Sequence, residues 1–123
     1  MTGRPLILAA DDNDDILGLV KAVLERAGYE VAAVGNGAQA LASVADRRPD
    51  LAVLDITMPE VDGLEVLRRL RADETTRDLP VVLLSAQAQE SDVEQGFAAG
   101  ASAYLKKPFR PRELTDSIAE LLG

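Results

Sequence analysis

Residues 6–12 read LILAADD, five apolar residues followed directly by two acids. A short apolar run that ends in polar residues is typical of a strand covered on both faces. Residues 51–54 and 81–84 have the same character and are followed by Asp55 and Ser85. Strands covered on both faces occur in parallel sheets with helices on each side, so the three runs predict an α/β fold.

Between these strands, apolar residues recur at the three- and four-residue spacing of amphipathic helices. Five strand–helix units result, which predicts a doubly wound, five-stranded parallel sheet with five helices in three layers. The strands are expected at residues 6–10, 29–34, 51–54, 81–84 and 103–105. Three helix starts are indicated by pairs at capping-box spacing, and Pro111 suits the first turn of the last helix. These pairs are Asn36 with Gln39, Asp62 with Glu65, and Ser91 with Glu94.

The composition excludes several classes of protein. The chain has 123 residues, a length that suits a single domain over residues 1–123, and a net charge of −8. It has no Cys and no His, which rules out disulfide scaffolds, zinc ribbons, Ser-His-Asp triads and imidazole metal sites. Any bound metal must therefore be held by oxygen, which favours hard cations such as Mg²⁺, with Mn²⁺ as an alternative.

Charge and hydropathy predict a cytoplasmic location. An acidic chain repels nucleic acids and anionic membranes, so no direct nucleic-acid or membrane partner is expected. The apolar run at residues 6–10 is shorter than the ~7–15 residues of a signal-peptide core. No segment approaches the ~20 apolar residues of a membrane span.

Polar residues follow the predicted strands where each of them ends. Asp11-Asp12, Asp55, Ser85 and Lys106-Lys107 come after the first, third, fourth and fifth strands. Because parallel strands end at the same edge of the sheet, three carboxylates, a hydroxyl and an ammonium group are expected to converge there.

This set of groups predicts a particular chemistry. Neighbouring carboxylates repel each other unless they are protonated or bridged by a cation, and Mg²⁺ accepts a few carboxylate or carbonyl ligands. A carboxylate can also attack a phosphoryl group to give an acyl phosphate. Phosphoryl transfer needs little beyond in-line positioning and charge neutralisation, which a divalent ion and a lysine supply. The residues therefore indicate Mg²⁺-dependent transfer of phosphate to an aspartate.

Four segments carry a resemblance to a known family. They are residues 7–12, residues 54–59 with Asp62-Gly63, residues 84–86, and residues 104–109, which read YLKKPF. In this order and spacing the chain resembles the receiver domains of two-component response regulators, the family of the chemotaxis response regulator. The similarity runs from Ile7 to Leu122 and implies a flavodoxin-like fold with strand order 2-1-3-4-5.

The resemblance assigns roles by position. Asp55 corresponds to the phospho-acceptor, and Asp11 and Asp12 correspond to the acidic pair that binds Mg²⁺ together with it. The backbone carbonyl of Thr57 corresponds to a further metal ligand. Lys107 corresponds to the lysine that neutralises the phosphate.

Two further positions resemble the switch of the family. Ser85 stands where the family usually has a Thr or Ser whose hydroxyl meets the phosphoryl group, and Tyr104 stands at the aromatic switch position. The family also has a cis peptide bond, which here is Lys107–Pro108. Thr57 and Gln87 occupy variable positions beside the acceptor, where side chains influence the lifetime of the phosphate.

The implied function is that of a phosphorylation-activated switch in two-component signal transduction. A sensor histidine kinase or a histidine phosphotransfer protein is the expected partner, and an aspartyl phosphate on Asp55 is the expected product. The face of the fourth helix, fifth strand and fifth helix is expected to change on phosphorylation. The chain is not expected to be an enzyme, since it catalyses only its own phosphorylation and dephosphorylation.

Two alternatives from other classes stay open. One is a binding scaffold of the same fold that never carries phosphate, although such proteins usually lose an acid or the lysine. The other is a phosphatase with an aspartyl nucleophile, although such enzymes have an acid two residues after the nucleophile, where this chain has Thr57. The printed sequence leaves no room for a DNA-binding domain, so both a stand-alone receiver and a fragment of a longer regulator are considered.

Several charged residues also have purely structural interpretations. Asp11 or Asp12 can cap the first helix, and Asp14 and Asp15 are expected to complement its dipole. Lys106 is expected to be a surface neighbour of Lys107. The cluster of Arg68, Arg69 and Arg71 is expected to serve the helix dipole and solvation rather than nucleic-acid binding.

Overall fold

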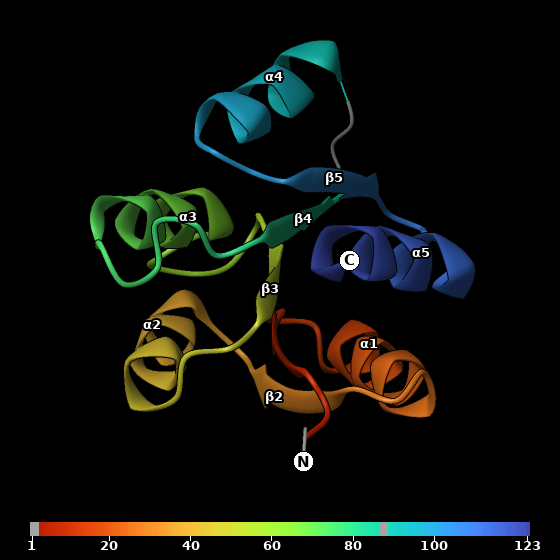
Figure 1. Cartoon of the computed structure of the whole chain (residues 1–123). Helices are drawn as coiled ribbons and strands as arrows, with labels where there is room; N and C mark the ends of the chain where they lie inside the picture. Colours follow the sequence, from red (N-terminus) through yellow and green to blue (C-terminus); the bar gives the residue numbers. More distant parts are fainter. Residues whose placement is uncertain (1–2, 87–88) are drawn as a thin grey trace.

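The computed structural model describes residues 3–86 and 89–123, which form one five-stranded parallel sheet with helices on both faces (Figure 1). The strand order is β2-β1-β3-β4-β5, as the resemblance implied. The strands are β1 (Leu6–Ala10), β2 (Glu30–Val34), β3 (Leu51–Asp55), β4 (Val81–Ser85) and β5 (Ala103–Lys106). The helices are α1 (Asp14–Arg26), α2 (Gly37–Asp46), α3 (Gly63–Ala72), α4 (Glu90–Ala98) and α5 (Pro111–Leu122).

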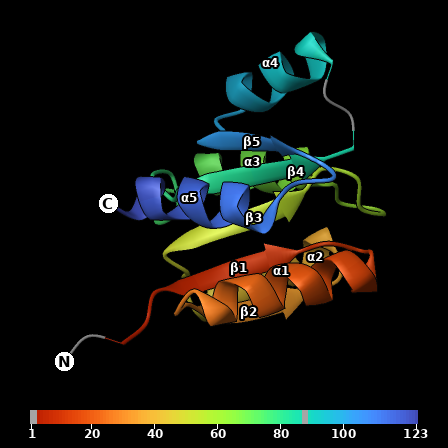
Figure 2. The same cartoon turned by 90° about the vertical axis from the view of Figure 1, so that its right-hand side faces the viewer.

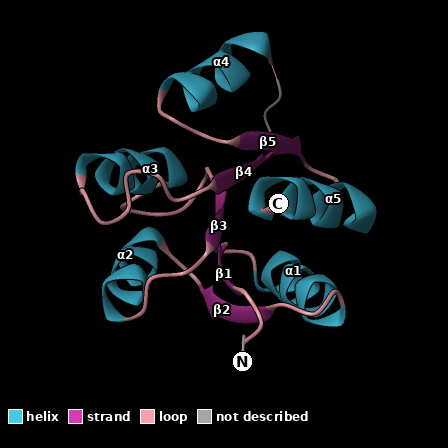
Figure 3. Ribbon diagram, in the orientation of Figure 1, coloured by secondary structure: helices cyan, strands magenta, loops and turns pink. Residues whose placement is uncertain are grey.

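The sheet separates two hydrophobic clusters, which confirms the predicted three layers (Figure 3). Because side chains alternate along a strand, Ile7 and Ala9 of β1 face α1 and α5, whereas Leu8 and Ala10 face α2 and α3. Every residue of β1, β3 and β4 is buried, as the continuous apolar runs predicted. The helix α4 lies beside the edge strand β5 (Figure 1).

The strands differ from the sequence prediction by one residue at several ends. β2 begins at Glu30 rather than at residue 29, whereas β3, β4 and β5 each extend one residue further, to Asp55, Ser85 and Lys106. The extension has a tertiary cause, because Asp55 pairs with Leu84 and Ser85 pairs with Lys106 in the parallel ladders. Asp55 and Ser85 are thus the last residues of rigid strands rather than loop residues.

The first helix is capped by Asn13, so the interpretation of Asp11 or Asp12 as its N-cap is wrong. The Asn13 side-chain oxygen accepts hydrogen bonds from the backbone N–H groups of Asp15 and Ile16, at 2.9 and 3.1 Å. Asp14 and Asp15 lie in the first turn, as expected. Asp11 and Asp12 precede the extended residue that leads into the helix, which leaves their carboxylates outside the cap.

Two of the three predicted helix starts are confirmed. Asn36 and Asp62 accept hydrogen bonds from the backbone N–H groups three residues later. Ser91 is not a cap, because α4 begins at Glu90 and the extended residue before it is Gln89. Pro111 is the first residue of α5, as predicted.

Replacing Asn13 by alanine is expected to lower the free energy of unfolding by about 1 kcal/mol, because two N–H groups of the first helical turn lose their acceptor. Urea denaturation in EDTA measures this loss. Asp12→Ala is the matched control and is expected to cost less. A larger loss of unfolding free energy for Asp12→Ala than for Asn13→Ala would indicate that Asp12, and not Asn13, caps the helix.

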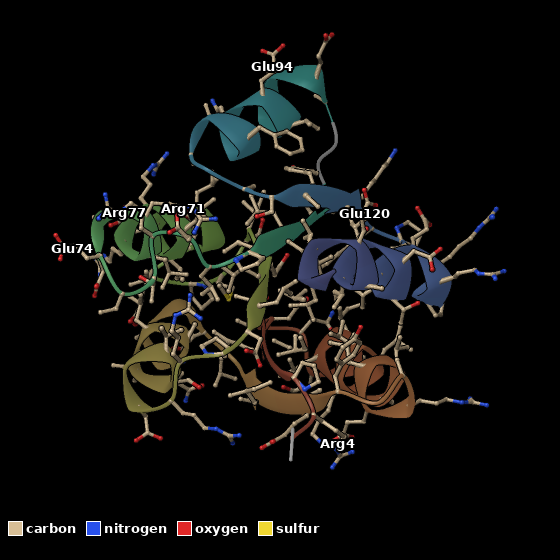
Figure 4. All side chains as sticks on the ribbon, in the orientation of Figure 1. Arg4, Arg71, Glu74, Arg77, Glu94 and Glu120 are labelled. Atoms are coloured by element: carbon tan, nitrogen blue, oxygen red, sulfur yellow. The ribbon has the colours of Figure 1, made fainter. Side chains whose placement is uncertain are left out.

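The arginine cluster of α3 has two different environments. Arg69 forms an ion pair with Glu65 at 2.9 Å on the exposed side of the helix. Arg71 instead donates two hydrogen bonds, at 2.8 and 3.1 Å, to the carbonyl oxygen of Gly100 in the turn before β5. Its partly buried guanidinium thus joins α3 to that turn (Figure 4), so the solvation interpretation is wrong for Arg71.

The described parts of the chain contain no helix that combines the length and the apolar character of a membrane span.

All five strands point the same way, and their carboxyl ends lie at the end of the molecule opposite to the two chain termini (Figure 2). That edge of the sheet holds the candidate site.

Candidate functional site

The site begins at the point where the strand order reverses. β1 lies between β2 and β3, and Ala10 pairs with Leu54, so Asp11 and Asp55 follow at neighbouring positions of the same edge. Ligands of doubly wound sheets bind at such a point, outside the carboxyl ends of the strands.

Three carboxylates meet there. Asp11, Asp12 and Asp55 each offer an oxygen, and these oxygens lie within 4.8 Å of one another. Asp11 and Asp55 are only 2% and 4% exposed, whereas Asp12 is open to solvent. Mg²⁺ binds through one or a few carboxylates and keeps several waters, so a cluster that is closed on one side and open on the other fits this ion.

Lys107 joins the two buried carboxylates. Its Nζ atom lies 3.0 Å from Asp11 Oδ2 and 3.0 Å from Asp55 Oδ1. The residue directly follows β5, its neighbour Lys106 is exposed as expected, and the Lys107–Pro108 peptide bond is cis, as the resemblance implied. The second oxygen of Asp11 accepts the backbone N–H of Asn13 at 2.9 Å, which holds this carboxylate at the start of the loop.

The protonation of the site follows from burial and charge. Burial raises the pKa of Asp55, and the nearby Asp11 and Asp12 act in the same direction against the hydrogen bond from Lys107. Burial works to lower the pKa of Lys107, but its hydrogen bonds to Asp11 and Asp55 outweigh burial and raise that pKa. Lys107 therefore stays charged, and burial makes ionisation of Asp55 less favourable than that of a free aspartate.

The loop after β3 is held against the sheet by backbone contacts. The N–H of Ile56 donates to the carbonyl of Leu84, and the N–H of Gly63 donates to the carbonyl of Ile56, both at 2.9 Å. A side chain at Gly63 would collide with the carbonyl oxygen of Asp55, so this close approach requires glycine. Thr57 lies in this loop with an exposed side chain.

The remaining predicted residues lie nearby on β4 and β5. Ser85 ends β4 and is buried, and it pairs with Lys106 in the ladder next to Lys107. Tyr104 is half-buried on β5 and packs on the hydrophobic cluster of α2 and α3. Gln87, which the resemblance places beside the acceptor, lies outside the described residues.

Two supporting residues had no predicted role at the site. Asn13 fixes the turn after Asp11, and its signal was present, since an asparagine stands directly before the first helical turn. Gly37 is the first residue of α2 and touches the loop after β3. No local sequence pattern indicates the contact between Gly37 and the loop after β3.

Fold and site together define a small doubly wound α/β domain with an acidic centre at the carboxyl edge of its sheet. The family model of the response regulator receiver domain matches residues 7–119. The chain belongs to this family.

Similar proteins agree with this assignment. The chain is 42% identical to the phosphate regulon transcriptional regulatory protein PhoB of Pseudomonas aeruginosa, over 99% of this chain and 53% of that protein. It is 44% identical to the DNA-binding regulator RpaA of Synechocystis, over 96% of this chain and 49% of that protein. The chain thus spans about half the length of these curated relatives.

Solved structures of similar chains have the same fold. The chemotaxis protein CheY4 of Vibrio cholerae superposes with a TM-score of 0.92 at 30% identity, over 97% of this chain and 99% of that chain. The receiver domain of a sensor histidine kinase from Pseudomonas aeruginosa PAO1 gives 0.91 at 34% identity, over 98% of this chain and 99% of that chain. That structure holds a magnesium ion in its active-site cleft.

Proposed function

We propose that the chain is a phosphorylation-activated switch that takes a phosphoryl group onto Asp55. The observation that carries the proposal is the placement of Asp55, which ends β3 in a buried position 3.0 Å from the Lys107 ammonium group and beside Asp11 and Asp12. Membership of the receiver family supports the same function.

The reaction is an in-line displacement at phosphorus. A carboxylate oxygen of Asp55 attacks the phosphoryl group of a phosphohistidine, which a histidine kinase or phosphotransfer protein presents. The new P–O bond forms as the P–N bond breaks, and the imidazole leaves with the electron pair and takes up a proton. Asp11, Asp12, Asp55 and the Thr57 carbonyl would hold Mg²⁺, which when bound would supply positive charge to balance the carboxylates and the phosphoryl oxygens.

The product then changes the packing nearby. An aspartyl phosphate adds negative charge at the end of β3, and Lys107 and the hydroxyl of Ser85 move toward its oxygens. Tyr104 repacks in response, which alters the face formed by α4, β5 and α5. The charge of the phosphate thereby shifts the equilibrium between two packing arrangements of this face.

The alternatives have less support. A scaffold that never carries phosphate does not need the three acids and the lysine that meet at this edge. A phosphatase with an aspartyl nucleophile typically has a second acid two residues after the nucleophile, where this chain has the exposed Thr57. We therefore regard the chain as a protein that catalyses only its own phosphorylation and dephosphorylation, and not as a turnover enzyme.

The output is proposed to pass through protein contacts in the cytoplasm. Several relatives are named as DNA-binding regulators, and the chain matches about half of their length. The acidic receiver has no proposed nucleic-acid contact of its own, so an effector domain or a separate target protein would read the α4–β5–α5 face.

Incubation with Mg²⁺ and acetyl phosphate is expected to add one phosphoryl group to the chain, as measured by mass spectrometry. EDTA is expected to prevent the addition, because the buried carboxylates then repel the donor. An unchanged mass under conditions where the protein is folded would overturn the proposal.

Mg²⁺ is also expected to raise the Tm, since it binds the folded chain only. At a concentration about 100 times its Kd, the added stability is about 2.7 kcal/mol. Differential scanning calorimetry with Mg²⁺ and with EDTA measures the shift. Asp11→Asn removes a predicted ligand and should lose most of the shift; a full shift in that variant would place the ion elsewhere.

A further inference from the structure

The first turn of α2 is in direct contact with the loop that follows β3. A Cβ atom at Gly37 would collide with the carbonyl oxygen of Val61, and it would lie 2.9 Å from the Cβ atom of Val61. Both partners of the collision belong to the backbone or are attached to it, so no side-chain rotation relieves it. Glycine at position 37 therefore allows a backbone approach that any other residue would prevent.

The loop would give way rather than the helix. α2 is anchored on the sheet by Ala40 and Val44, which are 0% and 8% exposed, and its start is capped by Asn36. The loop between Ile56 and Gly63 buries Met58 but leaves Thr57, Pro59 and Glu60 exposed, and Glu60 has a φ of 66°, outside the usual region for a non-glycine residue. A larger residue at position 37 would therefore displace the loop.

The displaced loop would carry the metal site with it. It leaves the sheet at Asp55 and contains Thr57, four residues before Val61. We propose that Gly37 is a positioning residue, whose close contact with Val61 sets the distance of this loop from Asp11 and Asp12. The inference rests on the proposed function, since it concerns the Mg²⁺ that the proposed reaction uses.

A displaced loop is expected to affect the affinities for Mg²⁺ and Ca²⁺ differently. Mg²⁺ requires near-ideal octahedral geometry at about 2.0–2.1 Å, whereas Ca²⁺ accepts irregular geometry at about 2.3–2.6 Å. A shifted loop is therefore expected to weaken Mg²⁺ binding more than Ca²⁺ binding. A general loss of stability would not change the ratio of the two affinities in the folded protein.

The test compares Gly37→Ala with Gly18→Ala, both by isothermal titration with Mg²⁺ alone and with Ca²⁺ alone. Gly18 lies within α1 and has nothing within 4 Å of its Cβ position, so it is a matched control. Gly37→Ala is expected to raise the Kd for Mg²⁺ by about tenfold, with a smaller rise for Ca²⁺. Unchanged Mg²⁺ affinity, or equal losses for both ions, would overturn the proposal.

A measurement on the unaltered chain covers the case in which Gly37→Ala does not fold. Mg²⁺ is expected to shift the backbone amide resonance of Gly37 together with that of Thr57, while the Gly18 resonance stays unchanged. A Thr57 shift without a Gly37 shift would contradict the coupling. If the unaltered chain shows no Mg²⁺ response at all, the proposed function itself fails, and the two failures are thereby distinguished.

Discussion

Replacing Asp55 by asparagine is expected to abolish phosphoryl incorporation and, at the same time, to raise the Tm of the metal-free protein at neutral pH. The loss of function follows because an amide is not a nucleophile toward phosphorus and cannot form the acyl phosphate. The gain in stability follows from the surroundings of the carboxylate. Burial, with Asp11 and Asp12 nearby, raises the pKa of Asp55, so its ionised form opposes folding.

The stability gained by Asp55→Asn is expected to depend on pH. A carboxyl group whose pKa is higher in the folded chain than in the unfolded chain destabilises the fold increasingly as the pH rises through its folded value. The advantage of Asp55→Asn should therefore be present at neutral pH and disappear below the ordinary pKa of an aspartate. Thermal unfolding in EDTA across this range measures it.

Asp116→Asn on α5 is the matched control, since it removes the same charge from an exposed position. It is expected to keep full phosphoryl incorporation and to show no comparable pH-dependent gain. Phosphorylation of Asp55→Asn at the rate of the unaltered chain would refute Asp55 as the acceptor. A lower Tm for Asp55→Asn at neutral pH would show that its pairing with Lys107 outweighs its burial.

Replacing Lys107 by methionine is expected to lower the free energy of unfolding in EDTA by about 3 kcal/mol, because it leaves two buried carboxylates without their counter-charge. Methionine keeps the apolar stem, so the loss reports the ammonium group rather than packing. The hydrogen bond from Lys107 is the main influence that lowers the pKa of Asp55, and its removal raises that pKa further. The variant should therefore regain stability as the pH falls, when Asp55 takes up a proton.

Lys106→Met provides the matched control for this prediction, because Lys106 is the exposed neighbour on β5. Urea denaturation of both variants is compared with and without Mg²⁺. Mg²⁺ is expected to restore much of the stability of Lys107→Met, since the cation supplies positive charge to the same carboxylates. Equal losses in the two lysine variants, or no recovery with Mg²⁺, would contradict a role of Lys107 as their counter-ion.

The buried strands were predictable from the sequence because each of them is a continuous run of apolar residues. In LILAA and the runs at 51–54 and 81–84, every residue is apolar, and short runs of this kind are typical of a strand covered on both faces. The placement of the acids followed from the same pattern, since the ends of parallel strands share one edge. The ends themselves moved by a residue, because ladder pairing such as that of Asp55 with Leu84 depends on the neighbouring strand.

The helix starts show that residue spacing alone does not always identify the capping residue. Asn36 and Asp62 cap their helices as their spacing predicts. Ser91 has the same spacing to Glu94 but lies inside α4, because the cap is the residue with extended backbone before the first turn, here Gln89. Similarly, Asn13 rather than the preceding acids caps α1.

The sequence alone therefore determined the elements, their parallel arrangement and the set of side chains at one edge of the sheet. Only the tertiary structure decided how those side chains meet. Lys107 bridges carboxylates that are 96 and 52 positions away, Asp11 is buried while its neighbour Asp12 is exposed, and Gly37 touches the loop after β3. The reason is that hydrogen bonding and hydropathy along the chain act between near neighbours, whereas distances across a site are set by the packing of whole helices and strands.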